Sequence, residues 1–384
     1  MKVAIMSMQR ILNYGSFMQA LSLKTMVESL GHEVVFVDFH PGLTVDGRKS
    51  TKQIFRFYKN KLNSAVKNNA LARKILKKRL GQNTSEVYDK FRECYNLLGL
   101  SDKYIFSYNA DVLIIGSDEV FNCLQSNSKV GYAKELFGYK AKSKTIISYA
   151  ASFGSTTLEG LKKYNLSDEV GAMLKRLDRI SVRDRNSEQL IIELCGRTPD
   201  VHLDPVLVGN IENMSWRNIE QSGYVAVYGY KNRFTSEEAD AIQRFAHSKG
   251  LFTLSIAEEQ SFCDKNIVCR PDEIISYIKK ADYVITDTFH GSIFSVICHK
   301  QFVAFCRRKN DTEKSYSTNE EKLGDMLERI GLLPRMINKV SELEEVIDKG
   351  IDYTLADEIR CLERGKALGY LSENLGMALE DAYE

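Results

Sequence analysis

The fold of this 384-residue chain is decided by three segments near its start: KVAIM (2–6), FMQALSLKTMVESLG (17–31) and EVVFVDF (33–39). The first and third are short apolar runs that predict buried strands. The second places its apolar residues at near-helical spacing and ends at Gly31, which predicts a helix. A strand, a helix and a strand of this size form a βαβ unit, so we expect a parallel sheet.

The same alternation continues along the chain. The first half has further predicted strands at DVLIIGSDE (111–119), KTIISYAASFG (144–154) and RISVRDR (179–185), and a helix at NSEQLIIELC (186–195) with Asn186 and Gln189 as a capping box. The second half has predicted strands at YVAVYGY (224–230), LFTLSIA (251–257), DYVITDT (282–288) and QFVAFC (301–306). Its predicted helices are 237–250, 271–281 and 289–300.

This pattern predicts an α/β protein with two Rossmann-like halves. We expect an N-terminal domain over 1–206 and a C-terminal domain over 207–345. The remaining residues, 346–384, form a predicted helical tail that can pack back on the N-terminal domain.

Composition excludes several classes of function. The 53 basic and 51 acidic side chains give a net charge of +2, so a uniformly basic nucleic-acid binder is excluded. The eight cysteines include no C-x-x-C pair, which leaves no zinc or redox motif, and scattered thiols suit a reducing cytoplasm. The start has no signal-peptide core, and no run of 18 apolar residues exists. We expect a cytoplasmic protein.

One segment departs from the average charge. Between Arg48 and Arg79 there are twelve Lys or Arg residues and no acid. The pattern predicts an inserted helical arm, 48–80, with one basic face. Such a face is usually only solvated, but it also favours the anionic inner surface of a membrane.

Ligands of open parallel sheets bind at the carboxyl ends of the strands, where the strand order reverses. The polar residues and glycines expected there are the candidate site residues: Asn13, Gly15, Ser16, Ser117, Asp118, Asn122, Ser152, Arg183, Thr288, His290, Gly291 and Ser292.

The sharpest of these signals is TDTFHGS (286–292), where a strand ends, a histidine follows and a helix begins. The N–H groups and dipole of a helix start favour an anion, and an imidazole adds a proton or positive charge. The alternative is that His290 caps its neighbours and Gly291 only permits tight packing.

Three other signals have equally plain alternatives. Arg183 ends a strand, and its guanidinium can bind a carboxylate or phosphate through two hydrogen bonds. The alternative is that it forms a surface ion pair with Asp184. NYGS (13–16) is a phosphate-binding turn, or a turn glycine followed by an N-cap at Ser16. GSDE (116–119) supplies a carboxylate at the sheet edge, or caps a helix.

With these residues in hand, the chain resembles the polysaccharide pyruvyl transferase family over about residues 1–335. Six motifs occur in the family's order: NYGSFxQAL (13–21), GSDEVFN (116–122), SYAASFG (148–154), SVRDxxS (181–187), LDPVL (203–207) and TDTFHGSxFS (286–295). The resemblance implies two Rossmann-like domains facing a cleft, as in type B glycosyltransferases. It also implies transfer of a pyruvyl group from phosphoenolpyruvate to two sugar hydroxyls as a ketal, with Arg183 and His290 in donor binding and catalysis.

The chain departs from the family pattern at two places. Many members have an acid where this chain has Ser16, so an acidic role there is not carried over. Phe121 stands where many relatives have Trp.

The residues fit a mechanism without a metal or cofactor. Arg183 and the helix start at Gly291–Ser292 would hold the donor's anionic groups, His290 would act as acid, and Asp118 would act as base. The acceptor would be a cell-surface polysaccharide or its lipid-linked precursor. The alternatives are a nucleotide-sugar glycosyltransferase of the same architecture and a non-catalytic glycan-binding relative.

Overall fold

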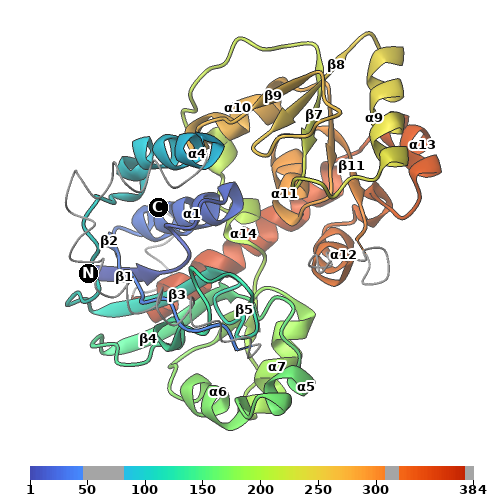
Figure 1. Ribbon diagram of the computed structural model, residues 1–384. Helices are drawn as coiled ribbons and strands as arrows, with labels where there is room; N and C mark the ends of the chain where they lie inside the picture. Colours follow the sequence, from blue (N-terminus) through green and yellow to red (C-terminus); the bar gives the residue numbers. More distant parts are fainter. Residues whose placement is uncertain (46–81, 308–319, 377–384) are drawn as a thin grey trace. The chain divides into compact units, whose positions relative to one another are not determined.

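The computed structural model describes residues 1–45, 82–307 and 320–376 (Figure 1). The predicted basic arm, 48–80, lies outside these residues. The chain divides into two compact units. Unit 1 comprises Met1–Pro205 and Gly365–Glu384, and unit 2 comprises Val206–Arg364.

Unit 1 is built on a parallel sheet with the strand order β2-β1-β3-β4-β5-β6. Chain order reverses between β1 and β3, where ligands of such sheets bind. The strands are β1 (Lys2–Met6), β2 (Glu33–Phe36), β3 (Val112–Asp118), β4 (Thr145–Ala151), β5 (Ser181–Val182) and β6 (Asp200–Val201). The α-helices within this unit are α1 (Tyr14–Ser29), α4 (Gln82–Glu93), α5 (Leu158–Lys163), α6 (Ser167–Leu174) and α7 (Arg185–Cys195), and the short α8 (Pro205–Val208) begins at its boundary.

Two helix starts differ from the predictions. Helix α1 is capped by Asn13, whose Oδ1 accepts from the Ser16 N–H at 3.1 Å, so the predicted N-cap at Ser16 is wrong. Helix α7 is capped by Asp184, whose Oδ1 accepts from the Ser187 N–H at 2.8 Å, and not by the predicted Asn186 box. In both cases the earlier residue has extended backbone, the conformation that a capping side chain requires.

Unit 2 also has a parallel sheet, with the order β12-β11-β10-β7-β8-β9. Numbered within the unit, this is the Rossmann order, and it reverses between β7 and β10. The strands are β7 (Tyr224–Tyr228), β8 (Phe252–Ile256), β9 (Lys265–Ile267), β10 (Tyr283–Thr286), β11 (Gln301–Phe305) and β12 (Met336–Ile337). Strands β9 and β12 were not predicted, because they are two or three residues long and lie at the sheet edges.

The helices of unit 2 follow the predicted ranges closely. They are α9 (Ser236–Ser248), α10 (Ile274–Lys280), α11 (Phe289–Ile297), α12 (Glu320–Arg329), α13 (Leu343–Asp348) and the start of α14 (Thr354–Asn374). The predicted helix at 271–281 begins as a 3-10 turn over Pro271–Glu273. The α/β class with parallel sheets is confirmed.

Helix α14 belongs to both units, and its last part accounts for the predicted packing of the tail on the N-terminal domain. In its first part, the Arg360 guanidinium donates from Nε to the Leu207 carbonyl at 2.9 Å, so this part packs in unit 2. Near its end, the Tyr370 hydroxyl donates to the Ser148 carbonyl at 2.8 Å in unit 1. Unit 2 therefore extends to Arg364, beyond the predicted end at 345.

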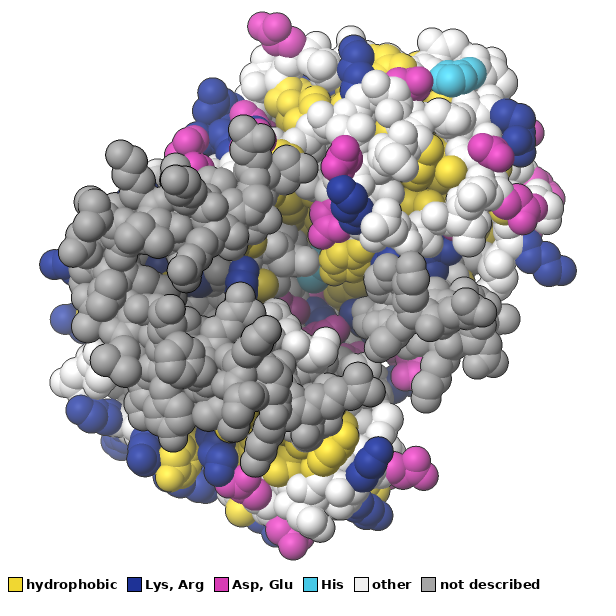
Figure 2. Space-filling model, in the orientation of Figure 1, with side chains coloured by type: hydrophobic (Ala, Val, Ile, Leu, Met, Phe, Trp, Pro, Cys, Tyr) yellow, Lys and Arg dark blue, Asp and Glu magenta, His cyan; other side chains and the backbone are white. Residues whose placement is uncertain are grey.

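The core of unit 1 contains Phe121, which is fully buried, stacks on Phe137 with ring centroids 4.9 Å apart and packs at a tilt against Phe153 at 5.4 Å. Burying one such side chain stabilises a fold by about 1.5–3 kcal/mol. On the face in Figure 2, basic and acidic side chains are interspersed, as the small net charge predicts. Among the described helices, none is long and apolar enough to cross a membrane.

Candidate functional site

At the carboxyl edge of the unit 1 sheet, Asp118 ends the central strand β3. Its Oδ2 accepts from the Ser16 hydroxyl at the start of α1 at 2.5 Å, and its Oδ1 accepts from the Glu119 N–H at 2.8 Å. The backbone of Asp118 is left-handed, with φ 78°. A residue other than glycine at this angle is strained, and such strain concentrates at functional sites.

Beside this pair lies a buried ion pair that the sequence analysis missed in part. The Arg183 Nη1 donates to Asp204 Oδ2 at 2.8 Å, and these side chains are 3% and 0% exposed. The Gln19 amide donates to the same Asp204 oxygen at 2.6 Å and to the Ser117 hydroxyl at 2.9 Å. The Asp204 carboxylate thus joins Arg183 and Gln19, the Gln19 amide adds Ser117, and the guanidinium is fixed.

The electrostatics around Arg183 are dominated by acids. Burial lowers the pKa of Arg183, but Asp204, Asp118, Asp184 and Glu119 together raise it above its ordinary value. The alternative of a surface pair between Arg183 and Asp184 is wrong, because both residues are buried. Asp184 instead caps α7 and accepts from the Ser152 hydroxyl at 2.6 Å.

The other candidates in unit 1 are engaged in bonds within the protein. The Asn122 amide donates to Glu119 at 2.8 Å and its oxygen accepts from Thr156 at 2.8 Å. Ser152 also accepts from the Gly154 N–H, Asn13 caps α1, and Gly15 lies buried in the first turn of α1. These bonds hold the loops around Asp118 and Arg183.

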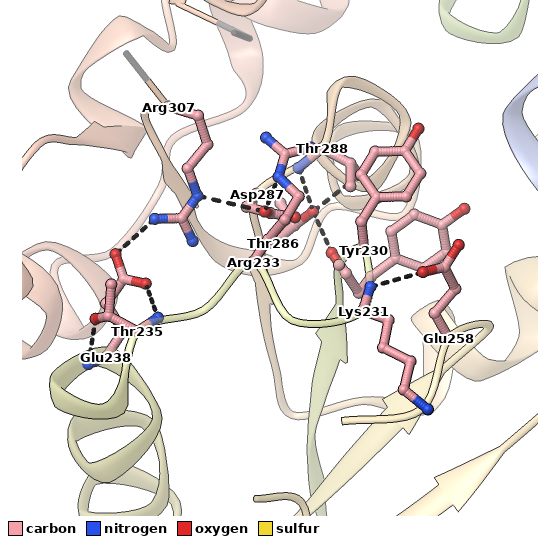
Figure 3. A network of polar contacts seen from close by, with 12 residues as sticks. Tyr230, Lys231, Arg233, Thr235, Glu238, Glu258, Thr286, Asp287, Thr288 and Arg307 are labelled. Atoms are coloured by element: carbon pink, nitrogen blue, oxygen red, sulfur yellow. Dashed lines mark hydrogen bonds and ion pairs between the residues drawn. The ribbon is translucent and has the colours of Figure 1, made fainter. Parts of the chain in front are cut away.

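At the carboxyl edge of the unit 2 sheet, Asp287 follows β10 and lies between two arginines (Figure 3). Its Oδ2 is 2.9 Å from Arg233 Nε and 3.3 Å from Arg307 Nε. Arg307 Nη1 also donates to Glu238 at 2.6 Å. The three residues after β7, β10 and β11 therefore meet where the strand order reverses.

Burial raises the pKa of the Asp287 carboxyl, and the charges of Arg233 and Arg307 oppose this rise. Two guanidinium groups on one fully buried carboxylate hold the loops at this edge together. Sequence reasoning missed both arginines. The signal that would have found them is a basic residue within a few positions of a strand's end.

The start of α11 contains the other candidates. Thr288 is its N-cap and accepts from the Gly291 N–H at 2.9 Å, while the Ser292 hydroxyl donates to the Thr288 carbonyl at 3.2 Å. A Cβ on Gly291 would lie 2.1 Å from Thr286 Oγ1, so this glycine permits tight packing, as the alternative predicted. His290 is half-buried on the first turn, with its ring 5.3 Å from that of Phe289.

The structure thus brings Ser16, Asp118 and Arg183 together in unit 1. It places Thr288, His290, Gly291 and Ser292 together in unit 2. Within the described ranges, no group of three or more His, Cys, Asp or Glu side chains is arranged to hold a metal ion. Both units carry polar groups at the reversal point of a parallel sheet, and together they define an α/β protein of two Rossmann-like units.

The chain belongs to the polysaccharide pyruvyl transferase family, whose model matches residues 13–306. The matched range contains all twelve candidate site residues and confirms the resemblance.

Solved structures with some likeness include a UDP co-structure of S. aureus MnaA, with 11% identity, a TM-score of 0.49 and coverage of 98% of this chain and 97% of that chain. A putative UDP-N-acetylglucosamine 2-epimerase from Listeria monocytogenes has 10% identity, a TM-score of 0.49 and coverage of 97% and 96%. The rhamnosyltransferase SpnG has 12% identity, a TM-score of 0.40 and coverage of 100% and 98%. No curated protein matches the chain significantly.

Proposed function

We propose that this protein transfers a pyruvyl group from phosphoenolpyruvate to two hydroxyls of a cell-surface glycan or its lipid-linked precursor, forming a pyruvyl ketal. The observation that carries the proposal is the family match over 13–306, which includes the strand ends bearing Arg183 and His290. Arg183 supports it further, because Asp204 fixes its guanidinium at a sheet edge where ligands bind.

In this proposal the guanidinium of Arg183 attracts the donor's carboxylate or phosphate. His290 gives a proton to the methylene carbon, the central carbon becomes electrophilic, and one sugar hydroxyl adds to it. A second hydroxyl then displaces phosphate and closes the ketal. Of the two hydroxyl protons, one balances the proton now in the new methyl group and the other leaves with phosphate.

Asp118 is the proposed base for the attacking hydroxyl. Its carboxylate lies in the same cluster as Arg183, close enough to raise the pKa of that guanidinium. A base must lie within hydrogen-bond reach of the hydroxyl it activates, so donor and acceptor would both engage this edge of unit 1.

The first test is calorimetric binding of phosphoenolpyruvate beside a panel of nucleotide sugars. We expect saturable binding of phosphoenolpyruvate that is lost in Arg183→Ala. Binding should be weakened in Arg183→Lys, which keeps the positive charge but not the paired N–H donors of the guanidinium. Arg185→Ala, which removes an exposed arginine two residues away, is the matched control. Binding of a nucleotide sugar alone would move the protein to the glycosyltransferase alternative.

The second test is turnover, followed as phosphate release and as the mass gain of the glycan. His290→Asn and Arg183→Ala should each lower kcat/KM by about 10²-fold or more, since one well-placed charged or donor group contributes that much. His299→Asn, on an exposed histidine of the same unit, should leave it unchanged. Losses below about tenfold in both site variants would remove the assigned roles. Glycan binding without turnover would favour the non-catalytic alternative.

We also propose that residues 48–80 give peripheral contact with anionic lipid, as a lipid-linked acceptor would require. The support is the run of twelve basic residues without an acid. Binding to phosphatidylserine vesicles should weaken as salt is added, because salt screens exposed charges. Absent or salt-independent binding would contradict this contact.

A further inference from the structure

Ser16 and Asp118 form a hydrogen-bonded pair that the sequence pattern did not predict. They are 102 residues apart in the chain, one at the start of α1 and the other at the end of β3, and their hydrogen bond is 2.5 Å long. Both lie just beneath the surface, with 5% and 8% of their areas exposed. The pair sits beside the reversal point of the unit 1 sheet.

We infer that Ser16 and Asp118 together bind the two hydroxyls of a diol, and that Ser16 is the residue that makes the site require a diol. This inference deepens the proposed function and rests on it. It assigns the acceptor side of the reaction to these two side chains.

The hydrogen-bonding capacity that Ser16 and Asp118 have left for a ligand indicates a diol. A serine hydroxyl has one hydrogen and two acceptor lone pairs. The Ser16 hydrogen is given to Asp118, so toward a ligand Ser16 can act only as an acceptor. Each carboxylate oxygen of Asp118 receives one bond, from Ser16 or from the Glu119 N–H, and each can accept another. Ser16 and the Asp118 carboxylate thus present acceptors side by side and no donor, and adjacent hydroxyls of a sugar supply the neighbouring donors that they require.

An anion is disfavoured at Ser16 and Asp118 themselves, because both side chains present acceptor oxygens there. Asp118, Glu119, Asp184 and Asp204 are the carboxylates that act on the single guanidinium of Arg183. A carboxylate or phosphate placed against Ser16 and Asp118 would face an acceptor and a like charge. A neutral hydroxyl would meet neither penalty.

The backbone fixes the direction of the pair. Asp118 holds φ 78°, and its carbonyl accepts from the Ser152 N–H at 2.9 Å. With its Oδ1 bound to the next N–H and its Oδ2 to Ser16, the carboxylate is held at both oxygens. A base held in this way needs little reorganisation to accept a proton from the first hydroxyl. Ser16 is then a positioning residue that orients Asp118 and the second hydroxyl.

The test uses a panel of methyl hexopyranosides with adjacent hydroxyl pairs, and monodeoxy counterparts that each lack one hydroxyl of a pair. Binding is measured by ligand-detected NMR without phosphoenolpyruvate. The natural protein should bind its preferred diol about tenfold more tightly than the monodeoxy counterpart, since losing one hydrogen bond to such a site costs about that factor.

In Ser16→Ala this discrimination should fall to about twofold or less, because the hydroxyl that accepts from the second sugar hydroxyl is gone. Ser16→Thr, which keeps the hydroxyl, should retain it. The matched control is Ser167→Ala, in the same unit, which removes a hydroxyl that has no hydrogen-bond partner among the described residues. A merely structural role of Ser16 would lower affinity for both sugars equally and leave the ratio unchanged.

Unchanged discrimination in Ser16→Ala, or no saturable binding of any diol, would overturn the inference. Failure of the proposed function gives a different pattern: diol discrimination that depends on Ser16, with no binding of phosphoenolpyruvate and no ketal.

Discussion

The two units place their polar groups at the same point of the same kind of sheet, but acidic groups are in excess in unit 1 and basic groups are in excess in unit 2. In unit 1, one buried guanidinium, Arg183, is acted on by four carboxylates. In unit 2, one buried carboxylate, Asp287, lies between two guanidinium groups, Arg233 and Arg307. The reversal point of a parallel sheet brings polar side chains together, and the residues after each strand decide the balance of charge there.

The two units also differ in how many partners stabilise their buried arginines. Arg183 is held by Asp204, but other acids lie close enough to stabilise its charge. Asp287 is the shared partner of both arginines of its edge, and Glu238 bonds only to Arg307 among the pairs described. The unit 2 network therefore depends more on a single residue.

The largest effect that tests this comparison is on stability. Asp287→Asn should lower the free energy of unfolding by about 3–5 kcal/mol, since it leaves two buried arginines without their shared carboxylate. Asp204→Asn should cost about half as much, because Asp118, Asp184 and Glu119 still act on Arg183. Urea unfolding measures both.

Asp240→Asn, on an exposed acid of α9, is the control and should change little. Equal losses in Asp204→Asn and Asp287→Asn would break the comparison, because they would show that the additional acids of unit 1 do not support Arg183.

A smaller effect concerns how closely the unit 2 edge is packed. Gly291→Ala should cost about 1–3 kcal/mol, because the added Cβ would lie 2.1 Å from Thr286 Oγ1, which is itself bonded to the Tyr228 carbonyl. Gly324→Ala is the matched control: its Cβ would meet Met336 at an ordinary 3.5 Å inside α12. There we expect a gain of about 0.5–1 kcal/mol from helix propensity. The same sign for both variants would refute the packing argument.

The smallest effect is the response of unit 2 to acid. A hydrogen bond from the Thr253 N–H, at 2.7 Å, is the main reason that the pKa of Asp264 lies below its ordinary 3.8. The lowered pKa means that ionised Asp264 stabilises the fold above pH 3.8 and that this contribution is lost as pH falls through the lower, folded value. The stability difference between the natural protein and Asp264→Asn should therefore shrink in acid. Hydrogen exchange at β8 reports it, and a difference that is constant with pH would contradict this assignment.

Much of the fold was readable from local pattern. The strand runs and the helix ranges follow from apolar spacing and from glycines such as Gly31, because these are properties of neighbouring residues. The helix caps were placed two or three residues late, since Asn13 and Asp184 act through side-chain bonds that spacing does not reveal. Strands β9 and β12 gave no signal because pairing with a neighbour, and not composition, makes them strands.

For the candidate site, the sequence by itself determined which residues lie at or just after the strand ends, and so it named Asp118, Arg183 and His290 as candidates. Only the tertiary structure decided their partners. The bonds of Ser16 to Asp118 and of Gln19 to Asp204 join residues 102 and 185 positions apart, and the meeting of Arg233 and Arg307 at Asp287 needs three strands side by side. Local sequence fixes where a strand ends, whereas strand order fixes which ends become neighbours, and that order is set by packing over the whole unit.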